Sequence, residues 1–217
     1  MTNRRCDRTV TRTTTSFGAM VLAVLLCAAP ATVASADQPT GTISCSIASG
    51  DEHSWPYTGF EFHPGLTGIP KTQTARVTDT QSSCDNSGIT GGSAPITEVS
   101  FRLTGKLREA TCASFFSSAS TLDKGKIKIR WVGLNPAGNR MTVATSKATV
   151  ASASYDDGTD TMTIVTDPID TGAFVDQVAT LHLAFQGDLD LYSSCIDENM
   201  TVRYAIYGGE LSTLEVQ

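Results

Sequence analysis

Residues 126–132 read KIKIRWV, and this strict alternation decides the fold class. The apolar side chains of Ile127, Ile129 and Trp131 alternate with basic residues at every intervening position. Successive side chains of a β-strand point to opposite faces, so the three apolar residues share one face. The pattern therefore predicts a strand with one buried face and one face in water.

Other segments repeat this period of two. They are residues 42–49, 97–107, 140–155, 161–166, 178–186 and 201–207. Turn residues at 135–139 and the Asp-Asp-Gly at 156–158 indicate hairpins between neighbouring segments. Helix signals are nearly absent, and residues 108–122 are expected to form a loop with one helical turn. The sequence thus predicts an all-β fold: a single-domain antiparallel β-sandwich or barrel of about 8–10 strands.

The N-terminal segment has the composition of a secretory signal peptide. Four arginines and one acid are followed by the apolar run FGAMVLAVLLCAAPA and by small residues before Asp37. The run is shorter than the ~20 residues that a membrane span requires. We therefore predict a signal peptide at residues 1–36, a secreted β domain at residues 37–217, and no transmembrane segment. The expected location is extracellular or in the cell envelope.

The charge balance restricts the partners of the secreted domain. The chain has 16 basic and 22 acidic residues, of which residues 1–36 hold 4 and 1, so 12 basic and 21 acidic residues remain, a net charge of −9. Nucleic-acid binding depends mainly on Lys and Arg, so we expect no nucleic-acid partner. We expect a monomer.

Four cysteines lie within residues 37–217: Cys45, Cys84, Cys112 and Cys195. An even number of cysteines in an oxidising compartment predicts two disulfides. Three pairings are open; we favour Cys45–Cys84 and Cys112–Cys195, because unnested pairs tie each half of the chain to itself. A zinc site is disfavoured, because C-x-x-C is absent and the histidines keep no ligand spacing to the cysteines. We predict no metal and no cofactor.

No residue is assigned a catalytic role. The G-x-S-x-G elbow typical of many serine hydrolases is absent from the sequence. His182 lies in the middle of a predicted strand, and a position on its solvent side is the favoured interpretation. His63 shares a strand face with Glu61, which permits a metal pair, although an ordinary wet face is favoured.

Two charged groups allow a functional and a structural interpretation. Asp156, Asp157 and Asp160 suit turn chemistry better than a calcium loop, since no distal Glu follows at EF-hand spacing. The other group is a basic row on the wet face of one strand, formed by Lys124, Lys126, Lys128 and Arg130. It can meet an anionic polymer or a lipid headgroup. The favoured interpretation is a charged outer face that keeps the sheet soluble and discourages edge pairing.

Residues 52–68, EHSWPYTGFEFHPGLTG, hold four of the 15 aromatic residues. Phe60 and Phe62 alternate with polar residues and are predicted to enter the core. Trp55 and Tyr57 precede this strand in a Pro-containing approach. They are the candidate ligand contacts, because exposed rings can stack on sugars or anchor a protein partner.

Several phrases together resemble a family. They are FEFHPGL, GKIKIRW followed by a hairpin, DPIDTGAFVDQ and SSCIDENMTVRYAIYGGEL. They are similar to a broad, largely uncharacterised group of small secreted actinobacterial proteins, and the resemblance spans most of residues 42–211. It implies a secreted, disulfide-linked β fold, no activity and no catalytic residue. The segment VGLNPAGNR after Trp131 is longer than the turn expected there.

These observations favour a secreted, non-catalytic binding module for a carbohydrate or a surface protein. A secreted glycan or ester hydrolase is the first alternative. A structural protein of the cell envelope is the second.

Overall fold

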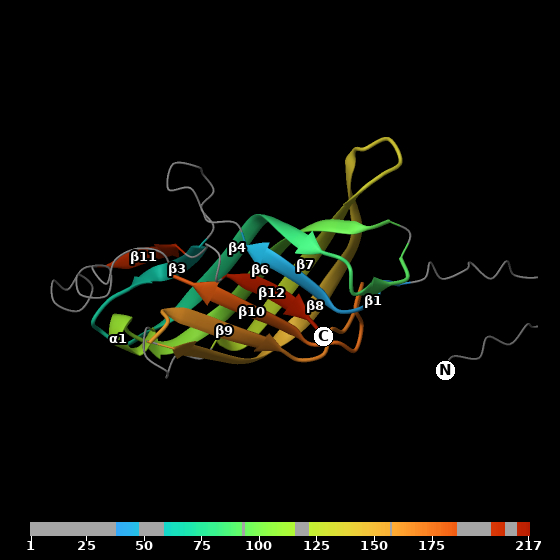
Figure 1. The fold of residues 1–217 in the computed structure, drawn as a ribbon. Coiled ribbons are helices and arrows are strands. Elements are labelled where there is room, and N and C mark those ends of the chain that lie inside the picture. Colours follow the sequence, from blue (N-terminus) through green and yellow to red (C-terminus); the bar gives the residue numbers. More distant parts are fainter. Residues whose placement is uncertain are drawn as a thin grey trace, which may run out of the picture. The chain divides into compact units, whose positions relative to one another are not determined.

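The structure is a computed structural model, and it describes residues 38–47, 59–92, 94–115, 122–156, 158–185, 201–206 and 212–217 (Figure 1). The strands are β1 (Thr40–Gly41), β2 (Ile43–Ile47), β3 (Gly59–Leu66), β4 (Lys71–Asp85), β5 (Ile89–Thr90), β6 (Ile96–Ala110), β7 (Leu122–Leu134), β8 (Arg140–Asp156), β9 (Thr161–Thr166), β10 (Ala179–Ala184), β11 (Val202–Ile206) and β12 (Thr213–Val216). A single turn of helix, α1 (Cys112–Phe115), follows β6. The predicted all-β fold is confirmed.

Eight of the strands close into an antiparallel barrel. Neighbours follow the order β4–β2–β12–β10–β9–β8–β7–β6, and β6 pairs in turn with β4. The sequence left a sandwich and a barrel open, and the β4–β6 pairing decides for the barrel. Outside the ring, β3 pairs with β4 and β11 with β3, while β1 and β5 form a separate two-stranded ribbon.

Strand β4 connects the barrel to the additional strands. Along one edge it pairs with β6, and along the other it pairs first with β3, through residues 74–78, and then with β2, through residues 82–85. A register shift between Asp79 and Ser82 lies where the partner changes. A bulge of this kind bends a strand and increases its twist. One strand can therefore serve both the closed ring and the β3–β11 branch.

Apolar side chains fill the barrel. The inward residues of β7 are Ile127, Ile129 and Trp131, and each is at most 2% exposed. An eight-stranded barrel has an interior just wide enough for side chains to fill. Across the ladder the partners on β6 are Leu103, Phe101 and Val99, which are equally buried. The alternation that predicted the strand thus also supplies the core.

A buried hydrogen-bond relay adjoins this core. The indole Nε1–H of Trp131 donates to Ser146 Oγ at 2.8 Å, and Ser146 Oγ donates to the carbonyl oxygen of Ala173 at 2.6 Å. Ala173 lies in the loop 167–178 between β9 and β10. In the same loop, Phe174 packs edge-on against Trp131 with ring centroids 4.9 Å apart. The relay therefore joins β7, β8 and the loop through groups that water does not reach.

Glycines permit two close approaches, one of them beside this relay. Gly172 has φ +99°, and a Cβ there would collide with the Thr145 carbonyl. Glycine alone adopts this conformation without steric cost. At the start of the GKIKIRW segment, a Cβ on Gly125 would lie 2.8 Å from Val150 Cγ2. Gly125 and Gly172, which lie in two of the segments that carried the family resemblance, thus have structural reasons.

Four phenylalanines from β3, α1 and the end of β10 pack together. Phe60 and Phe62 on β3 are buried, as predicted, and contact Phe115 of α1 with centroid distances of 5.4 and 4.8 Å. Phe185, after β10, lies 5.6 Å from Phe60. Aromatic pairs in these edge-on and tilted arrangements contribute about 0.5–1.5 kcal/mol beyond the area they bury.

One complete disulfide is seen among the described residues, where two were expected. Cys45 on β2 and Cys84 on β4 lie directly opposite each other and are bonded, with Cα atoms 4.0 Å apart. This confirms the first predicted pair. Cys112 is also disulfide-bonded, but its partner and Cys195 lie outside the described residues. The second pair, Cys112–Cys195, therefore stays a prediction.

The remaining strand predictions agree with the structure, with four omissions. The segments predicted from alternation correspond to β2, β6, β8, β9, β10 and β11, and the single turn α1 lies in the expected loop. The omissions are the barrel strands β4 and β12 and the two-residue strands β1 and β5, for which the sequence predicted no strand. The part of the chain that the structure describes holds no helix with the length and hydrophobicity of a membrane span.

The relay should be a large contributor to stability. Ser146→Ala leaves the Trp131 indole and the Ala173 carbonyl buried without their partner, so we expect a loss of about 2–4 kcal/mol in the free energy of unfolding. Ser154→Ala removes an exposed hydroxyl from the same strand and should change it by less than about 0.5 kcal/mol. Urea unfolding measures both, and equal midpoints would contradict the role of the relay.

The disulfide should act mainly on the unfolded chain. Its cysteines are 39 residues apart, so the double variant Cys45→Ala/Cys84→Ala should lose about 4 kcal/mol on the chain-entropy estimate. Denaturant unfolding under non-reducing conditions tests this. A loss below about 1 kcal/mol would show that the bond does not constrain the unfolded chain as that estimate requires.

Candidate functional site

The outer surface of β6, β7 and β8 carries a concentrated positive charge. We define the basic face as the exposed side chains of Arg102 on β6, Lys126, Lys128 and Arg130 on β7, and Lys147 on β8. Each alternates with a buried neighbour, so the residues that fill the core also direct these cations outward. A chain of net charge −6 thus presents five cations on three adjacent strands.

Strand register brings three of these cations into a transverse row. Lys128 is the Cα partner of Arg102 on one side and of Lys147 on the other. Directly opposite residues have Cβ atoms about 4.5–5.5 Å apart, and like charges in such pairs destabilise a sheet. Along β7, Lys126 and Arg130 lie two residues to either side of Lys128, a step of about 6.7 Å. Lys128 is thus the centre of a cross of positive charge.

Hydroxyl groups lie between the cations. Thr104 and Thr149 are the Cα partners of Lys126, while Ser100 and Thr145 are the partners of Arg130. All four are half-buried on this surface. They supply hydrogen-bond donors beside the charges, which suits a ligand with both anionic groups and polar oxygens.

The described carboxylates do not neutralise the basic face. The ion pairs between described residues lie elsewhere: His63 with Glu61 at 2.6 Å, Arg76 with Glu61 at 4.0 Å, and Arg140 with Glu98. Asp170 meets Lys147 through a backbone hydrogen bond, from the Asp170 amide to the Lys147 carbonyl, 2.9 Å long. The five cations therefore face solvent as unpaired charges within the described part of the chain.

The row faces outward as predicted, but the structure corrects the part of the favoured interpretation that concerned edge pairing. Charged side chains that discourage edge pairing are needed on strands with a free edge. Strand β7 has none, because it pairs with β6 on one side and β8 on the other within a closed barrel. Lys124 is exposed like the other cations of the row, but it lies at an irregular end of β7, with φ 52° beside the register shift between Thr104 and Lys106. The basic face is therefore confined to the regular part of the strand.

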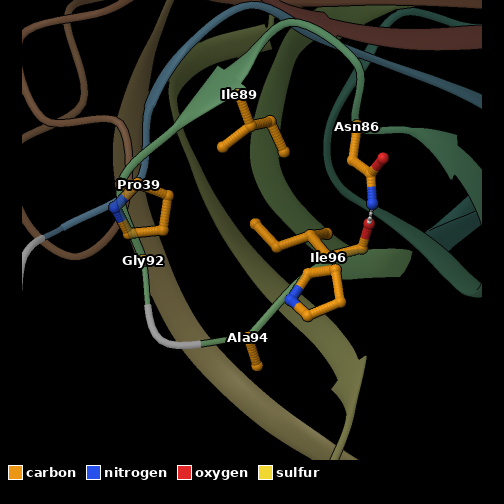
Figure 2. A pocket seen from close by; sticks show the side chains of 8 residues that line it. Pro39, Asn86, Ile89, Gly92, Ala94 and Ile96 are labelled. Atoms are coloured by element: carbon orange, nitrogen blue, oxygen red, sulfur yellow. Dashed lines mark hydrogen bonds between the residues drawn. The ribbon is translucent and has the colours of Figure 1, made fainter.

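A small hollow next to the β1–β5 ribbon is a weaker candidate. It encloses about 290 Å³ and is lined by Pro39, Asn86, Ile89, Gly91, Gly92, Ala94, Pro95 and Ile96. Figure 2 shows Asn86 turned to the backbone of Ile96, where its Nδ2 donates to the carbonyl oxygen at 3.1 Å. The amide is thus already used within the protein. The lining consists otherwise of small and apolar residues, so this hollow offers little chemistry.

A second hollow, of about 480 Å³, is lined by two carboxylates from the strands on either side of β2. Asp85 on β4 and Glu215 on β12 flank Ser44 of β2, to which both are paired. Two interstrand steps place the two backbones about 9.6 Å apart, close to the separation of about 6.5–9.5 Å between the carboxyl groups of an inverting glycosidase. Ser87, by its backbone amide first and then its hydroxyl, holds the pKa of the Asp85 carboxyl below its usual value. A general acid needs the opposite shift, so Asp85 is unsuited to that role.

The histidines and the acidic turn keep their structural interpretations. His182 is half-buried, with Nδ1 3.2 Å from the Thr163 hydroxyl across the β9–β10 ladder. Asp156 Oδ1 accepts from the amide of Gly158, and Asp160 accepts from the hydroxyl of Tyr155, within the predicted β8–β9 hairpin. Among the described residues, no three His, Cys, Asp or Glu side chains gather as metal ligands would.

The candidate contacts Trp55 and Tyr57 lie outside the described residues, so their role stays a prediction. Sequence reasoning found Lys126, Lys128 and Arg130 but did not place Arg102 and Lys147 beside them. Alternation assigns each of these residues to a wet face, but only strand register shows that they adjoin. Comparison with protein-family models, with curated proteins and with solved structures finds no match.

The pKa of Asp85 can be tested by a carboxyl NMR titration. Ser87→Ala keeps the amide donor and removes the hydroxyl, so the pKa should rise part of the way toward 3.8. Because the folded pKa is lowered, Asp85 stabilises the fold above its unfolded pKa, and this contribution disappears as the pH falls through the folded pKa. Ser46→Ala, farther along β2, should leave the titration unchanged. An ordinary pKa in the unmodified protein would contradict the assignment.

Proposed function

We propose that this chain is a non-catalytic binding module whose basic face recognises an anionic ligand outside the cell. The observation that carries the proposal is the alignment of Arg102, Lys128 and Lys147 on adjacent strands without an ion pair to any described carboxylate. The charges lie on an outer face of a filled barrel, so the core that holds them in place does not depend on the ligand.

Energetics support a ligand for this arrangement. Like charges directly opposite each other in a sheet cost stability, typically by a few tenths of a kcal/mol to about 1 kcal/mol. An anion placed over the row adds an attractive interaction with each of the three cations, and these attractions outweigh the repulsion between the cations. The cost in the free protein thus becomes a gain in the complex.

The acidity of the whole chain does not oppose such binding at physiological salt. The Debye length there is about 8 Å, so charges on distant strands are largely screened from a ligand on the basic face. Net charge is a guide to solubility and nonspecific association. The local row, rather than the total, determines the potential that a bound anion experiences.

The proposed location outside the cell has two supports. Residues 1–36 have the pattern of a cleavable leader, and the Cys45–Cys84 disulfide suits an oxidising compartment. We also propose that the chain belongs to the group of secreted actinobacterial proteins that its sequence resembles. A carbohydrate or protein partner at Trp55 and Tyr57, a hydrolase and a structural envelope protein remain alternatives from the sequence alone.

Binding to phosphocellulose tests the proposal. Despite its acidic pI of about 5.0, the protein should be retained at pH 7 and eluted by salt. Lys128→Gln should lower the eluting salt concentration, whereas Lys71→Gln, an exposed strand lysine away from the face, should not.

The triple variant Arg102→Gln/Lys128→Gln/Lys147→Gln should flow through the column. It should also be as stable as the parent, or more stable by up to about 1 kcal/mol, because the like-charge contacts are gone. Failure of the parent to bind, or equal elution of Lys128→Gln and Lys71→Gln, would overturn the proposed function.

A further inference from the structure

The spacing of the basic face selects among anionic ligands. Resting on the proposed function, we propose that the ligand is a linear polymer with one anionic group for every six backbone bonds, bound along β7. A phosphodiester polymer with three-carbon linkers has this chemistry. Each phosphate would meet one of the cations Lys126, Lys128 and Arg130.

The argument for the repeat starts from the strand. Outward residues on β7 recur every two residues, and two residues of an extended chain contain six backbone bonds and span about 6.7 Å. An extended polymer in which six bonds join successive phosphorus atoms has a closely similar repeat. Such a ligand can therefore stay in register with all three cations without contracting either chain.

The neighbouring strands β6 and β8 make the three cation positions on β7 unequal. Only the central position, at Lys128, has a cation on both neighbours, Arg102 and Lys147. The outer positions, at Lys126 and Arg130, have hydroxyl residues on both sides. The central anion would thus be held by three charges, and each outer anion by one charge and adjacent hydroxyls. This predicts a site for three consecutive anionic groups.

The side chains beside the outer cations disfavour a single-stranded nucleic acid, although its backbone has the same six-bond repeat. Proteins that bind single strands without sequence preference combine basic grooves with aromatic side chains on which the bases stack. The side chains adjoining the outer cations are instead Ser100, Thr104, Thr145 and Thr149. They offer hydroxyls to a polyol and no stacking surface to a base.

Synthetic oligo(glycerol phosphate) of one to six phosphates is the probe, with isothermal titration calorimetry as the measurement. Affinity should rise with each phosphate up to three and change little beyond, apart from the statistical gain of longer chains. A trimer with six-carbon linkers has equal charge but nine bonds between phosphates. It should bind about five-fold or more weakly, since it must lose more freedom to fit the cations.

The variant Arg130→Gln tests whether successive phosphates bind along β7. In Arg130→Gln, the gain from the second to the third phosphate should disappear, while Lys71→Gln should keep it. Equal affinity of the two trimers, or an unchanged gain in Arg130→Gln, would overturn the repeat while leaving retention on phosphocellulose intact. Tighter binding of a thymidine trinucleotide, or of phosphatidylglycerol vesicles at equal accessible phosphate, would overturn the ligand class. If the unmodified protein bound none of these anions and was not retained on phosphocellulose, the proposed function itself would be refuted.

Discussion

The hydrogen-bond relay from Trp131 through Ser146 to Ala173 is the constraint on which the rest of the structure depends. It is buried, so each of its polar groups needs its partner, and it joins two strands and a loop at once. Trp131 and Ser146 are diagonal neighbours on β7 and β8, since Trp131 pairs with Ala144 and Ile129 with Ser146. The relay thus holds β7 and β8 in one register.

That register determines the outer surface as well. A slip of one residue would move every side chain of a strand to the other face. Because Trp131 and Ser146 meet inside, Lys128 and Lys147 must meet outside. The repulsion between the two lysines is small compared with the cost of a broken buried relay. The core can therefore impose a charge arrangement that the surface alone would not favour.

How much the sequence predicted depended on how regular each strand is. Strand β7 alternates isoleucine and tryptophan with cations, and it was predicted from this pattern alone. Strand β4 was missed, although it joins the ring to the β3–β11 branch, because its inward residues include the polar Gln73 and the small Ala75. Alternation can be recognised only when the two faces of a strand differ in polarity, and the two faces of β4 differ little. Barrel closure depends on β4, so a sandwich and a barrel could not be distinguished.

Prediction of the candidate site from the sequence was limited in the same way. Alternation shows which residues face water, but adjacency between strands depends on register, and register is set by distant contacts such as the relay. Lys126, Lys128 and Arg130 could therefore be found, while Arg102 and Lys147 could not be placed beside them. The interpretation of the row also changed with topology: a lysine row protects a free edge, yet in a closed barrel β7 has no edge to protect. Once edge protection is removed, the aligned cations still give the free protein a charged, solubilising surface, but they also repel one another, and the proposed anionic ligand would offset that repulsion.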